Sequence, residues 1–438
     1  MTTELLNFAA RLREAILSEG RVPRGPDLKG QNGGSCNSPL RDFNRLALEL
    51  FALQFKHNAA CRKICEARNL TPDVIEHWTQ IPAVPTSAFK ELELTCLAPG
   101  ERTVVFHSSG TTEQKPSRHF HNAESLAVYE ASLQAWFQAN VTIGAPNSGS
   151  ACFQPGIVRA DSEIGAPSAW QFQLIILTPP SKQAPHSSLV HMFETVRRKL
   201  GAAETAFVGK LAADGSWTLN FDATLAALNS SLVTRHPSLL LGTAFSFVHL
   251  LDFLAERNLR FDLPSGSRVM ETGGYKNRSR SMSKTELHQF ITEMLGVPSS
   301  HIICEYGMSE LSSQAYSYVT GDTWQVTRNG SASCHASPVT CHFSFPSWAR
   351  VQIISPETAI EVADGETGLI RVFDLANVFS VMAIQTEDLG IRRGDGFELI
   401  GRAALAEPRG CSLMMLEGSA SSLPQSKWGI DKTMPSKK

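Results

Sequence analysis

Four hydroxyl side chains surround one glycine in a stretch whose residue types and spacing suit phosphate binding. The stretch consists of Ser108, Ser109, Gly110, Thr111 and Thr112. The apolar residues 104–106 precede it and predict the end of a buried strand. Small residues let a backbone approach a ligand closely, and hydroxyl groups donate hydrogen bonds to phosphate oxygens. Lys115 and Arg118 add the positive charge that a polyphosphate requires, and His119 follows them. The stretch predicts a phosphate-binding loop, with a Ser/Thr-rich surface turn as the alternative.

A tyrosine beside a glycine follows a second apolar stretch and opens the segment Tyr306-Gly307-Met308-Ser309-Glu310. A tyrosine ring at a strand end can lie against a base, and the carboxylate of Glu310 can bind a divalent cation. Taken alone, the pattern is also typical of a structural turn.

Two further stretches carry groups that suit a nucleotide. Gly273 and Gly274 follow a predicted strand and precede a basic cluster, for which a solvated turn is the alternative. Asp388 precedes a hairpin-like Asp-Gly turn, and Arg402 follows that turn. Because a carboxylate can accept hydrogen bonds from both hydroxyls of a ribose, Asp388 is a candidate nucleotide-binding residue.

Taken in order, these segments resemble the motifs of the adenylate-forming superfamily, which includes acyl-CoA ligases and luciferases. The resemblance covers roughly residues 81 to 412. A narrower resemblance is to the acyl-protein synthetase (LuxE-type) family of bacterial fatty-acid reductase systems. The segments that carry it are Ile81-Pro82-Ala83-Val84-Pro85-Thr86, Pro116-Ser117-Arg118-His119, Pro185-His186-Ser187-Ser188-Leu189, Thr272-Gly273-Gly274-Tyr275-Lys276 and Arg409-Gly410-Cys411-Ser412.

The resemblance implies activation of a fatty acid with ATP and Mg²⁺ to acyl-AMP, and then transfer of the acyl group to a cysteine of the enzyme. It implies delivery to an acyl reductase partner. Carried over by position, Ser108 to Lys115 would hold the ATP phosphates and Glu310 would bind Mg²⁺. Around the nucleotide would lie Gly273, Gly274, Tyr306 (against adenine), Gly307, Asp388 (at the ribose) and Arg402 (at the hinge). Lys115, His119 and the acyl acceptor Cys411 are the catalytic candidates, and the alternative for Cys411 is a small buried residue.

The sequence departs from the superfamily pattern in two places. Glu113 stands where the phosphate loop usually has glycine, and the separate C-terminal domain with its catalytic lysine is missing. Two other functions therefore stay open: an acyl- or aryl-CoA ligase, and a non-catalytic nucleotide-binding partner of another enzyme.

Alternation of helical and strand patterns predicts an α/β fold: the N-terminal domain of an adenylate-forming enzyme, with two parallel α/β subdomains, a small β subdomain and a truncated C-terminus. Apolar spacing predicts helices over 3–18, 40–68 (one or two), 123–139, 187–200, 222–232, 245–256 and 283–295, and strands over 174–177, 205–208, 238–241 and 269–270. The expected units are a helical segment (1–80), the α/β core (81–322), the β subdomain with the hinge (323–416) and a disordered tail (417–438).

Composition restricts the function further. A formal charge of −2 argues against a general electrostatic interaction with nucleic acid or an acidic membrane. No apolar run is long enough to span a bilayer. The nine scattered cysteines do not form the pattern of a disulfide framework and favour a cytoplasmic setting. Cys334-His335 and Cys341-His342 form a compact cluster whose spacing is unusual for zinc, so alternating strand residues are the preferred interpretation.

Overall fold

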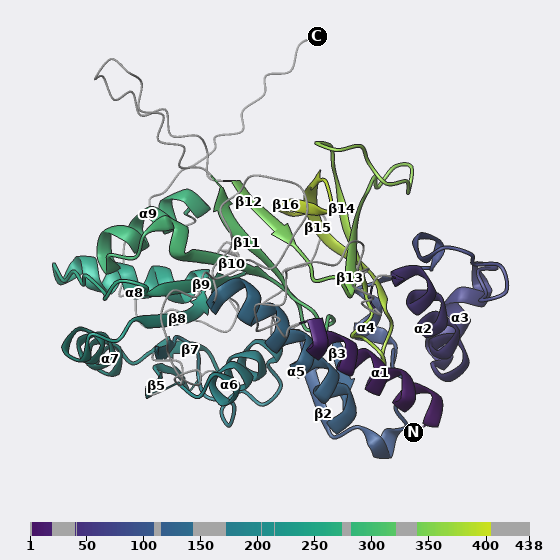
Figure 1. Cartoon of the computed structure of the whole chain (residues 1–438), viewed down its shortest axis with the longest axis horizontal. Coiled ribbons are helices and arrows are strands. Elements are labelled where there is room, and N and C mark those ends of the chain that lie inside the picture. The colour runs from purple at the N-terminus through teal and green to yellow at the C-terminus, as the bar shows by residue number, and fades with distance from the viewer. Residues whose placement is uncertain are drawn as a thin grey trace, which may run out of the picture.

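The computed structural model describes residues 2–19, 40, 42–108, 115–142, 172–202, 204–213, 215–273, 282–320 and 340–403. Its main feature is one mixed sheet of 12 strands in the order β13-β14-β15-β16-β12-β11-β10-β9-β8-β4-β5, with β1 beside β15 (Figure 1). The α/β prediction is therefore confirmed.

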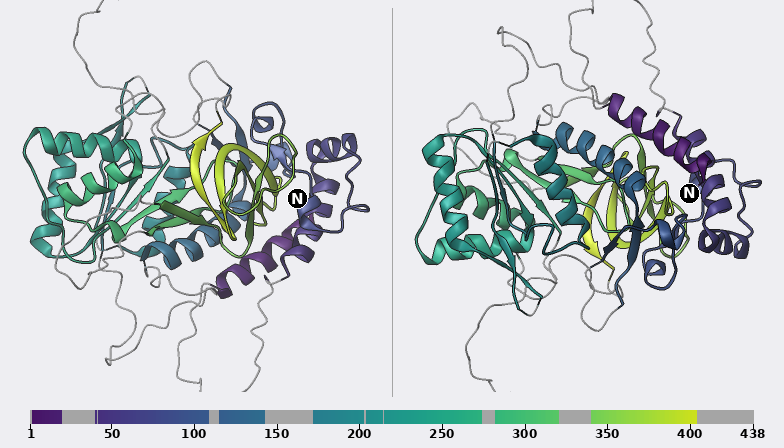
Figure 2. Two further views of the ribbon diagram at one scale, coloured as in Figure 1. Left: turned by 90° about the horizontal axis from the view of Figure 1, so that it is seen from above. Right: turned by 90° about the horizontal axis from the view of Figure 1, so that it is seen from below.

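One half of the sheet is parallel and has helices on both faces (Figure 2). Its strands are β5 (Glu204–Phe207), β4 (Gln173–Ile176), β8 (Ser238–Thr243), β9 (Arg268–Thr272) and β10 (Ile302–Tyr306). Helices α5 (Ala123–Phe137) and α6 (Ser188–Leu200) pack on one face, and α7 (Phe221–Thr234), α8 (Ala244–Glu256) and α9 (Lys284–Leu295) pack on the other. Successive strand residues enter opposite cores, as Leu174 and Ile175 do, which explains why these strands are apolar throughout.

The other half of the sheet is antiparallel and contains β11, from the end of the segment predicted as the α/β core, together with the strands that the sequence assigned to a β subdomain. They are β11 (Ala315–Thr320), β12 (Thr340–Ser344), β16 (Gly396–Arg402), β15 (Ala383–Arg393), β14 (Thr367–Asp374) and β13 (Ala349–Ile354); β1 (Val84–Pro85) runs parallel to β15. Hydrogen bonds continue from β10 through β11 to β12, so one sheet links residues on both sides of position 322. The proposed domain division stays a prediction.

The N-terminal helices cover the antiparallel half, at the end opposite α7 to α9 (Figure 1). They are α1 (Thr3–Glu19), α2 (Phe43–His57) and α3 (Ala59–Ala67). The helical pattern over 40–68 forms two helices, because the backbone of Asn58 is extended and ends the first one. The Asn58 side chain accepts the N–H of Cys61 and so caps the start of α3. The buried amide of Gln54 donates to the carbonyl of Asn377 at 2.8 Å and accepts the N–H of Met382 at 3.0 Å. These bonds connect α2 to the turn between β14 and β15.

Two short hairpins complete the described strands: β2 (Val104–His107) with β3 (Arg118–His121), and β6 (Gly209–Leu211) with β7 (Trp217–Leu219). The strand expected over 104–106 is confirmed, but of its residues only Phe106 is buried. The sequence pattern did not predict β3. In β3 the buried positions are His119 and His121, while Arg118 and Phe120 are partly exposed. An alternation of this kind is invisible to a hydrophobicity pattern, because the polar residue type lies inside.

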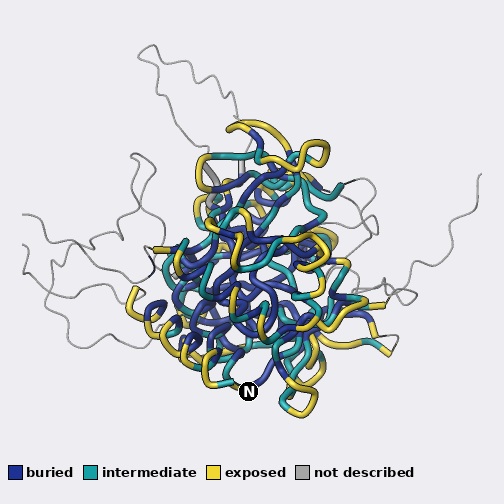
Figure 3. The backbone as a smooth tube through the Cα atoms, turned by 90° about the vertical axis from the view of Figure 1, so that its right-hand side faces the viewer, coloured by how far each residue is buried: buried dark blue, intermediate teal, exposed yellow. Residues whose placement is uncertain are grey.

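Buried residues form a continuous interior along the sheet, and exposed residues lie on the outer turns (Figure 3). The described part of the chain also contains α4 (Ala88–Glu91), the 3₁₀ helices Trp78–Gln80, Pro99–Glu101 and Ser299–His301, and a π turn at Gln138–Thr142. None of the described helices combines the length and the apolar character that crossing a bilayer requires.

Candidate active site

Tyr306, Asp388 and Arg402 lie in direct contact, although they are far apart in the sequence. The phenol of Tyr306 donates to Asp388 Oδ2 at 2.9 Å, and Arg402 Nε lies 3.4 Å from Asp388 Oδ1. The pairing of β15 with β16 places Asp388 opposite Arg402, and β10 brings Tyr306 to them at its carboxyl end. Three of the residues predicted for the nucleotide therefore come together at one edge of the parallel strands, where ligands bind in open α/β sheets.

Aromatic rings fix the orientation of Tyr306. Its ring lies edge-on to Phe343, Phe345 and Phe397, with ring centres 5.2 to 6.3 Å apart. Tyr306 is 6% exposed, whereas the side chain of Asp388 is 17% exposed. The arrangement presents a partly exposed carboxylate next to a group of packed aromatic rings.

Glu310 and His119 form a second buried group beside the first hairpin. His119 Nδ1 lies 2.8 Å from the carbonyl of Ser309, so this ring nitrogen carries the hydrogen and donates it. The hydroxyl of Ser309 donates to Glu310 Oε2 at 2.9 Å, and Glu310 is 1% exposed. Burial lowers the pKa of His119, which keeps the ring neutral. His119 thus holds the segment that carries the predicted metal ligand.

A buried aspartate, Asp374, positions the turn that follows Glu310. Its Oδ2 accepts the N–H groups of Ser312 and Ser313 at 2.9 and 2.8 Å, and its Oδ1 accepts the hydroxyl of Ser313 and the N–H of Ala376. Burial raises the pKa of Asp374 although these bonds oppose the change. This residue could not be singled out from the sequence, because a single aspartate at the end of a strand has no pattern of its own.

The start of the phosphate loop is fixed by the β2–β3 hairpin. The N–H of Ser108 donates to the carbonyl of Ser117 at 3.3 Å, and the Ser108 hydroxyl accepts the N–H of Ser117 at 3.0 Å. Lys115 is exposed and pairs with Glu91 at 2.9 Å. Ser109, Gly110, Thr111 and Thr112 lie outside the described residues, as does Glu113.

Gly273 follows β9 with a φ of +79°, a conformation that favours glycine, and no described atom lies within 4 Å of where its Cβ would be. Gly307 is different, because a Cβ there would collide with the carboxylate of Glu305. Glu305 is buried and accepts the hydroxyl of Thr272, and burial raises its pKa to about 7. Gly274 and Cys411 lie outside the described residues.

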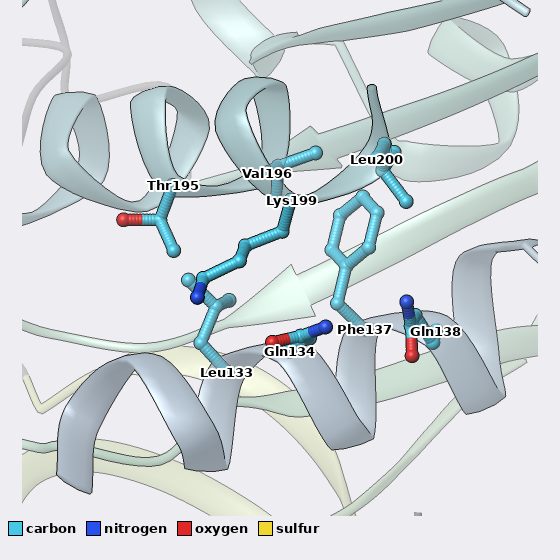
Figure 4. A pocket seen from close by; sticks show the side chains of 8 residues that line it. All are labelled: Leu133, Gln134, Phe137, Gln138, Thr195, Val196, Lys199 and Leu200. Atoms are coloured by element: carbon cyan, nitrogen blue, oxygen red, sulfur yellow. The ribbon is translucent and has the colours of Figure 1, made fainter. Parts of the chain in front are cut away.

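Two hollows in the described part of the chain lie elsewhere. A recess of about 10 Å³ lies between α5 and α6, where Figure 4 shows Lys199 beside Leu133 and Phe137. A groove of about 330 Å³ is lined by α1, α2 and Leu40. The recess has room for about one water molecule, and neither hollow is lined by a predicted site residue.

Solved structures of similar fold show the class of protein to which this chain's fold belongs. The fold is similar to that of a 2-hydroxyisobutyryl-CoA ligase in complex with its acyl-AMP and CoA, with a TM-score of 0.55 and 12% identity over 88% of this chain and 75% of that chain. The same ligase in its postadenylation state matches with a TM-score of 0.55 and covers 88% and 74%. The fold is therefore that of the adenylate-forming ligases.

The family model of acyl-protein synthetase, LuxE, matches residues 119–419. The chain belongs to this family and is an adenylate-forming ligase. The long-chain-fatty-acid–luciferin-component ligase of Vibrio harveyi is 23% identical over 381 residues, which make up 85% of this chain and 86% of that protein. The protein of the same name from Aliivibrio fischeri is 23% identical over 388 residues, with coverage of 86% and 88%.

Proposed function

We propose that this ligase activates a long-chain fatty acid with ATP and transfers the acyl group to its own Cys411. The contact between Tyr306, Asp388 and Arg402 is the observation that carries the nucleotide part of the proposal. The names of the two curated relatives, which both specify a long-chain fatty acid, support the choice of substrate.

In the first step a carboxylate oxygen of the fatty acid attacks the α-phosphorus of ATP. A bond forms between that oxygen and phosphorus, and the bond to the bridging oxygen of pyrophosphate breaks. Positioning and charge neutralisation dominate this kind of reaction. The exposed ammonium of Lys115 is close to the hairpin turn and is free to exchange Glu91 for a phosphate oxygen, since surface ion pairs contribute little.

Asp388 holds the ribose, and Tyr306 lies against the adenine. Glu310 offers the hard oxygen atoms that Mg²⁺ prefers, and one carboxylate plus substrate phosphates is a usual ligand set for this ion. Bound there, Mg²⁺ would neutralise phosphate charge. His119 contributes through its hydrogen bond to Ser309, which positions the backbone next to Glu310.

In the second step the thiolate of Cys411 attacks the acyl carbonyl of the mixed anhydride. A thioester forms, AMP leaves with the electron pair of the broken bond, and the thiol proton goes to solvent. An acyl reductase in the cytoplasm would then accept the acyl group.

The test is the intact mass of the protein after incubation with ATP, Mg²⁺ and a series of fatty acids, without CoA. The wild type is expected to gain one fatty-acyl group that hydroxylamine removes. Cys411→Ser should form acyl-AMP and pyrophosphate but carry no adduct, and Cys96→Ser serves as the matched control that keeps it. Pyrophosphate release only after CoA addition would assign the protein to the CoA ligases. Absence of both adduct and pyrophosphate would identify a non-catalytic nucleotide-binding protein.

A further inference from the structure

Five chemically active side chains converge on the sheet face beneath α9. None of them is placed around the nucleotide, although Lys284 Nζ lies 3.5 Å from the carbonyl oxygen of Gly273. They are Glu271 from β9, Lys284 and His288 from α9, Cys304 from β10 and Cys341 from β12. Glu271, His288 and Cys304 are all 1% exposed or less, and Cys341 is also buried. No step of the proposed reaction uses them.

Sheet register explains why these groups meet. Glu271 and Cys304 are paired in the parallel ladder of β9 and β10, so both side chains point to the same face. Cys304 pairs with Ser317 of β11, and Cys341 pairs two residues further along β11. Lys284 and His288 are four residues apart, so they occupy one side of α9, the side that covers this face.

Three of the distances between the potential ligand atoms are short and similar. Cys304 Sγ lies 3.4 Å from Cys341 Sγ and 3.6 Å from His288 Nε2, and His288 Nε2 lies 3.5 Å from Glu271 Oε1. Bonds of about 2.0 to 2.3 Å to a tetrahedral Zn²⁺ separate neighbouring ligand atoms by roughly 3.3 to 3.8 Å. The three distances lie in this range.

Cys304 and Cys341 are free thiols whose sulfur atoms lie 3.4 Å apart. The sulfur atoms of a disulfide are about 2.05 Å apart, so these two are close without being bonded. A metal ion can bridge two thiolates at this separation.

One carboxylate oxygen of the cluster accepts no hydrogen bond from the described residues and can therefore bind a metal ion. Glu271 Oε2 is buried without a hydrogen-bond partner there, while Oε1 contacts the ammonium of Lys284. Charge also balances, because two thiolates and one carboxylate carry −3, and Zn²⁺ with Lys284 carries +3. Among the residues that the structure describes, Glu271, His288 and Cys304 form the one group of three whose ligand atoms all lie within 4.8 Å of one another, and Cys341 adjoins this group through Cys304, 3.4 Å from its sulfur.

We propose that Glu271, His288, Cys304 and Cys341 bind one structural Zn²⁺ ion, with Lys284 as the counter-charge next to Glu271. The ion would join β9, β10, β12 and α9 directly below the strand ends that carry Thr272, Gly273 and Tyr306. It would hold these strand ends in register without taking part in the reaction. The sequence grouped Cys341 with His342, Cys334 and His335 and favoured alternating strand residues over a zinc site there. His342 is exposed next to the buried Cys341, and the other two lie outside the described residues.

The test is the zinc content of protein produced in zinc-supplemented medium and purified without chelator. One zinc per chain is expected for the wild type, and a loss to below about one tenth is expected for Cys304→Ser/Cys341→Ser. Cys61→Ser/Cys65→Ser is the matched control and should keep the zinc, because it removes the other close pair of buried cysteines. Zinc lost only from the Cys61/Cys65 variant would overturn the proposal.

Cobalt spectroscopy keeps the test decisive if the double variant does not fold. Metal-free wild type and the Cys61→Ser/Cys65→Ser control are titrated with Co²⁺, and both should develop thiolate-to-cobalt charge-transfer absorption that saturates at one ion per chain. Excess Zn²⁺ should abolish it. A wild type that is free of zinc and develops no such absorption would refute the site. Neither measurement depends on ATP or a fatty acid, so failure of the proposed function would not affect the result.

Discussion

Two buried glutamates on neighbouring strands have opposite electrostatic environments. Burial alone would raise the pKa of Glu271, but the adjacent Lys284 and His288 lower it to about 2. Burial raises the pKa of Glu305 to about 7, because the Thr272 hydroxyl compensates only part of the loss of water. Glu271 points toward α9, and Glu305 lies on the opposite face, which α5 and α6 cover. Glu271 is therefore ionised, whereas Glu305, one residue further along the neighbouring strand, is half protonated near neutral pH.

The comparison shows that a counter-charge, rather than depth, decides the charge state of an acid in this sheet. A buried ion requires a partner, or it takes up a proton and becomes neutral. The two glutamates lead to opposite predictions for the free energy of unfolding. Removing the partner of Glu271 should lower it, whereas removing the charge of Glu305 should raise it.

The largest effect on stability is expected for Lys284→Met. The measurement is made in EDTA, so that no metal ion contributes charge next to Glu271. The variant leaves Glu271, which is 0% exposed, without its counter-charge. A loss of about 3 to 5 kcal/mol in the free energy of unfolding is expected from urea denaturation. The control is Glu271→Gln/Lys284→Met, which removes both charges and should recover most of the loss. A loss below about 1 kcal/mol in the single variant would assign the compensating charge to His288.

The elements of the parallel half were predictable from the sequence, and the buried cluster was not. Runs such as Leu239-Leu240-Leu241 are apolar on both faces, and helices such as α9 begin at a recognisable Ser283 cap and end at Gly296, so local patterns suffice. The cluster combines positions 271, 284, 288, 304 and 341. Their proximity depends on the strand order and on the register across β11, which no local spacing encodes.

The candidate active site was predictable from the sequence only in part. Tyr306, Asp388 and Arg402 were selected because each lies in a short motif, and the structure brings the three together. Their roles toward ATP stay predictions, as do those of Ser108, Lys115, His119, Gly273, Gly307 and Glu310. The link from His119 to Ser309 could not be inferred from the motifs, because a tertiary contact between β3 and the turn after β10 creates it.

The second prediction concerns Glu305→Gln and its dependence on pH. The folded protein holds the Glu305 proton up to a pKa of about 7, whereas the unfolded chain releases it near 4.5. Stability of the wild type should therefore fall as the pH rises from about 4.5 to about 7, and the Gln variant should lack this loss. The variant is expected to gain about 3 kcal/mol relative to the wild type across this window.

Urea denaturation at several pH values measures the difference. Glu357→Gln, which changes an exposed carboxylate, is the matched control and should follow the wild type. A constant difference between Glu305→Gln and the wild type from pH 4.5 to 7.5 would show that Glu305 remains ionised when buried. The comparison with Glu271 would then fail.

The smallest effect is expected for Asp388→Asn, the third carboxylate of this region. Asp388 is partly solvated and lies between Tyr306 and Arg402, so it is ready to accept hydrogen bonds from a ligand. The amide oxygen of asparagine can still accept from Tyr306, so the free energy of unfolding should change by about 1 kcal/mol or less. A ribose would lose hydrogen bonds to a charged acceptor, each worth about 1.5 to 3 kcal/mol.

The expected result is a decrease of roughly 10- to 100-fold in kcat/KM for ATP, measured by pyrophosphate release with saturating fatty acid. Asp395→Asn, in the exposed turn between β15 and β16, is the matched control and should leave kcat/KM unchanged. If Asp388→Asn retained full activity, the carboxylate would serve only to hold Tyr306 and Arg402 together. Asp388 would then be a structural acid, as Glu271 is, and the distinction between binding and structural acids in this sheet would disappear.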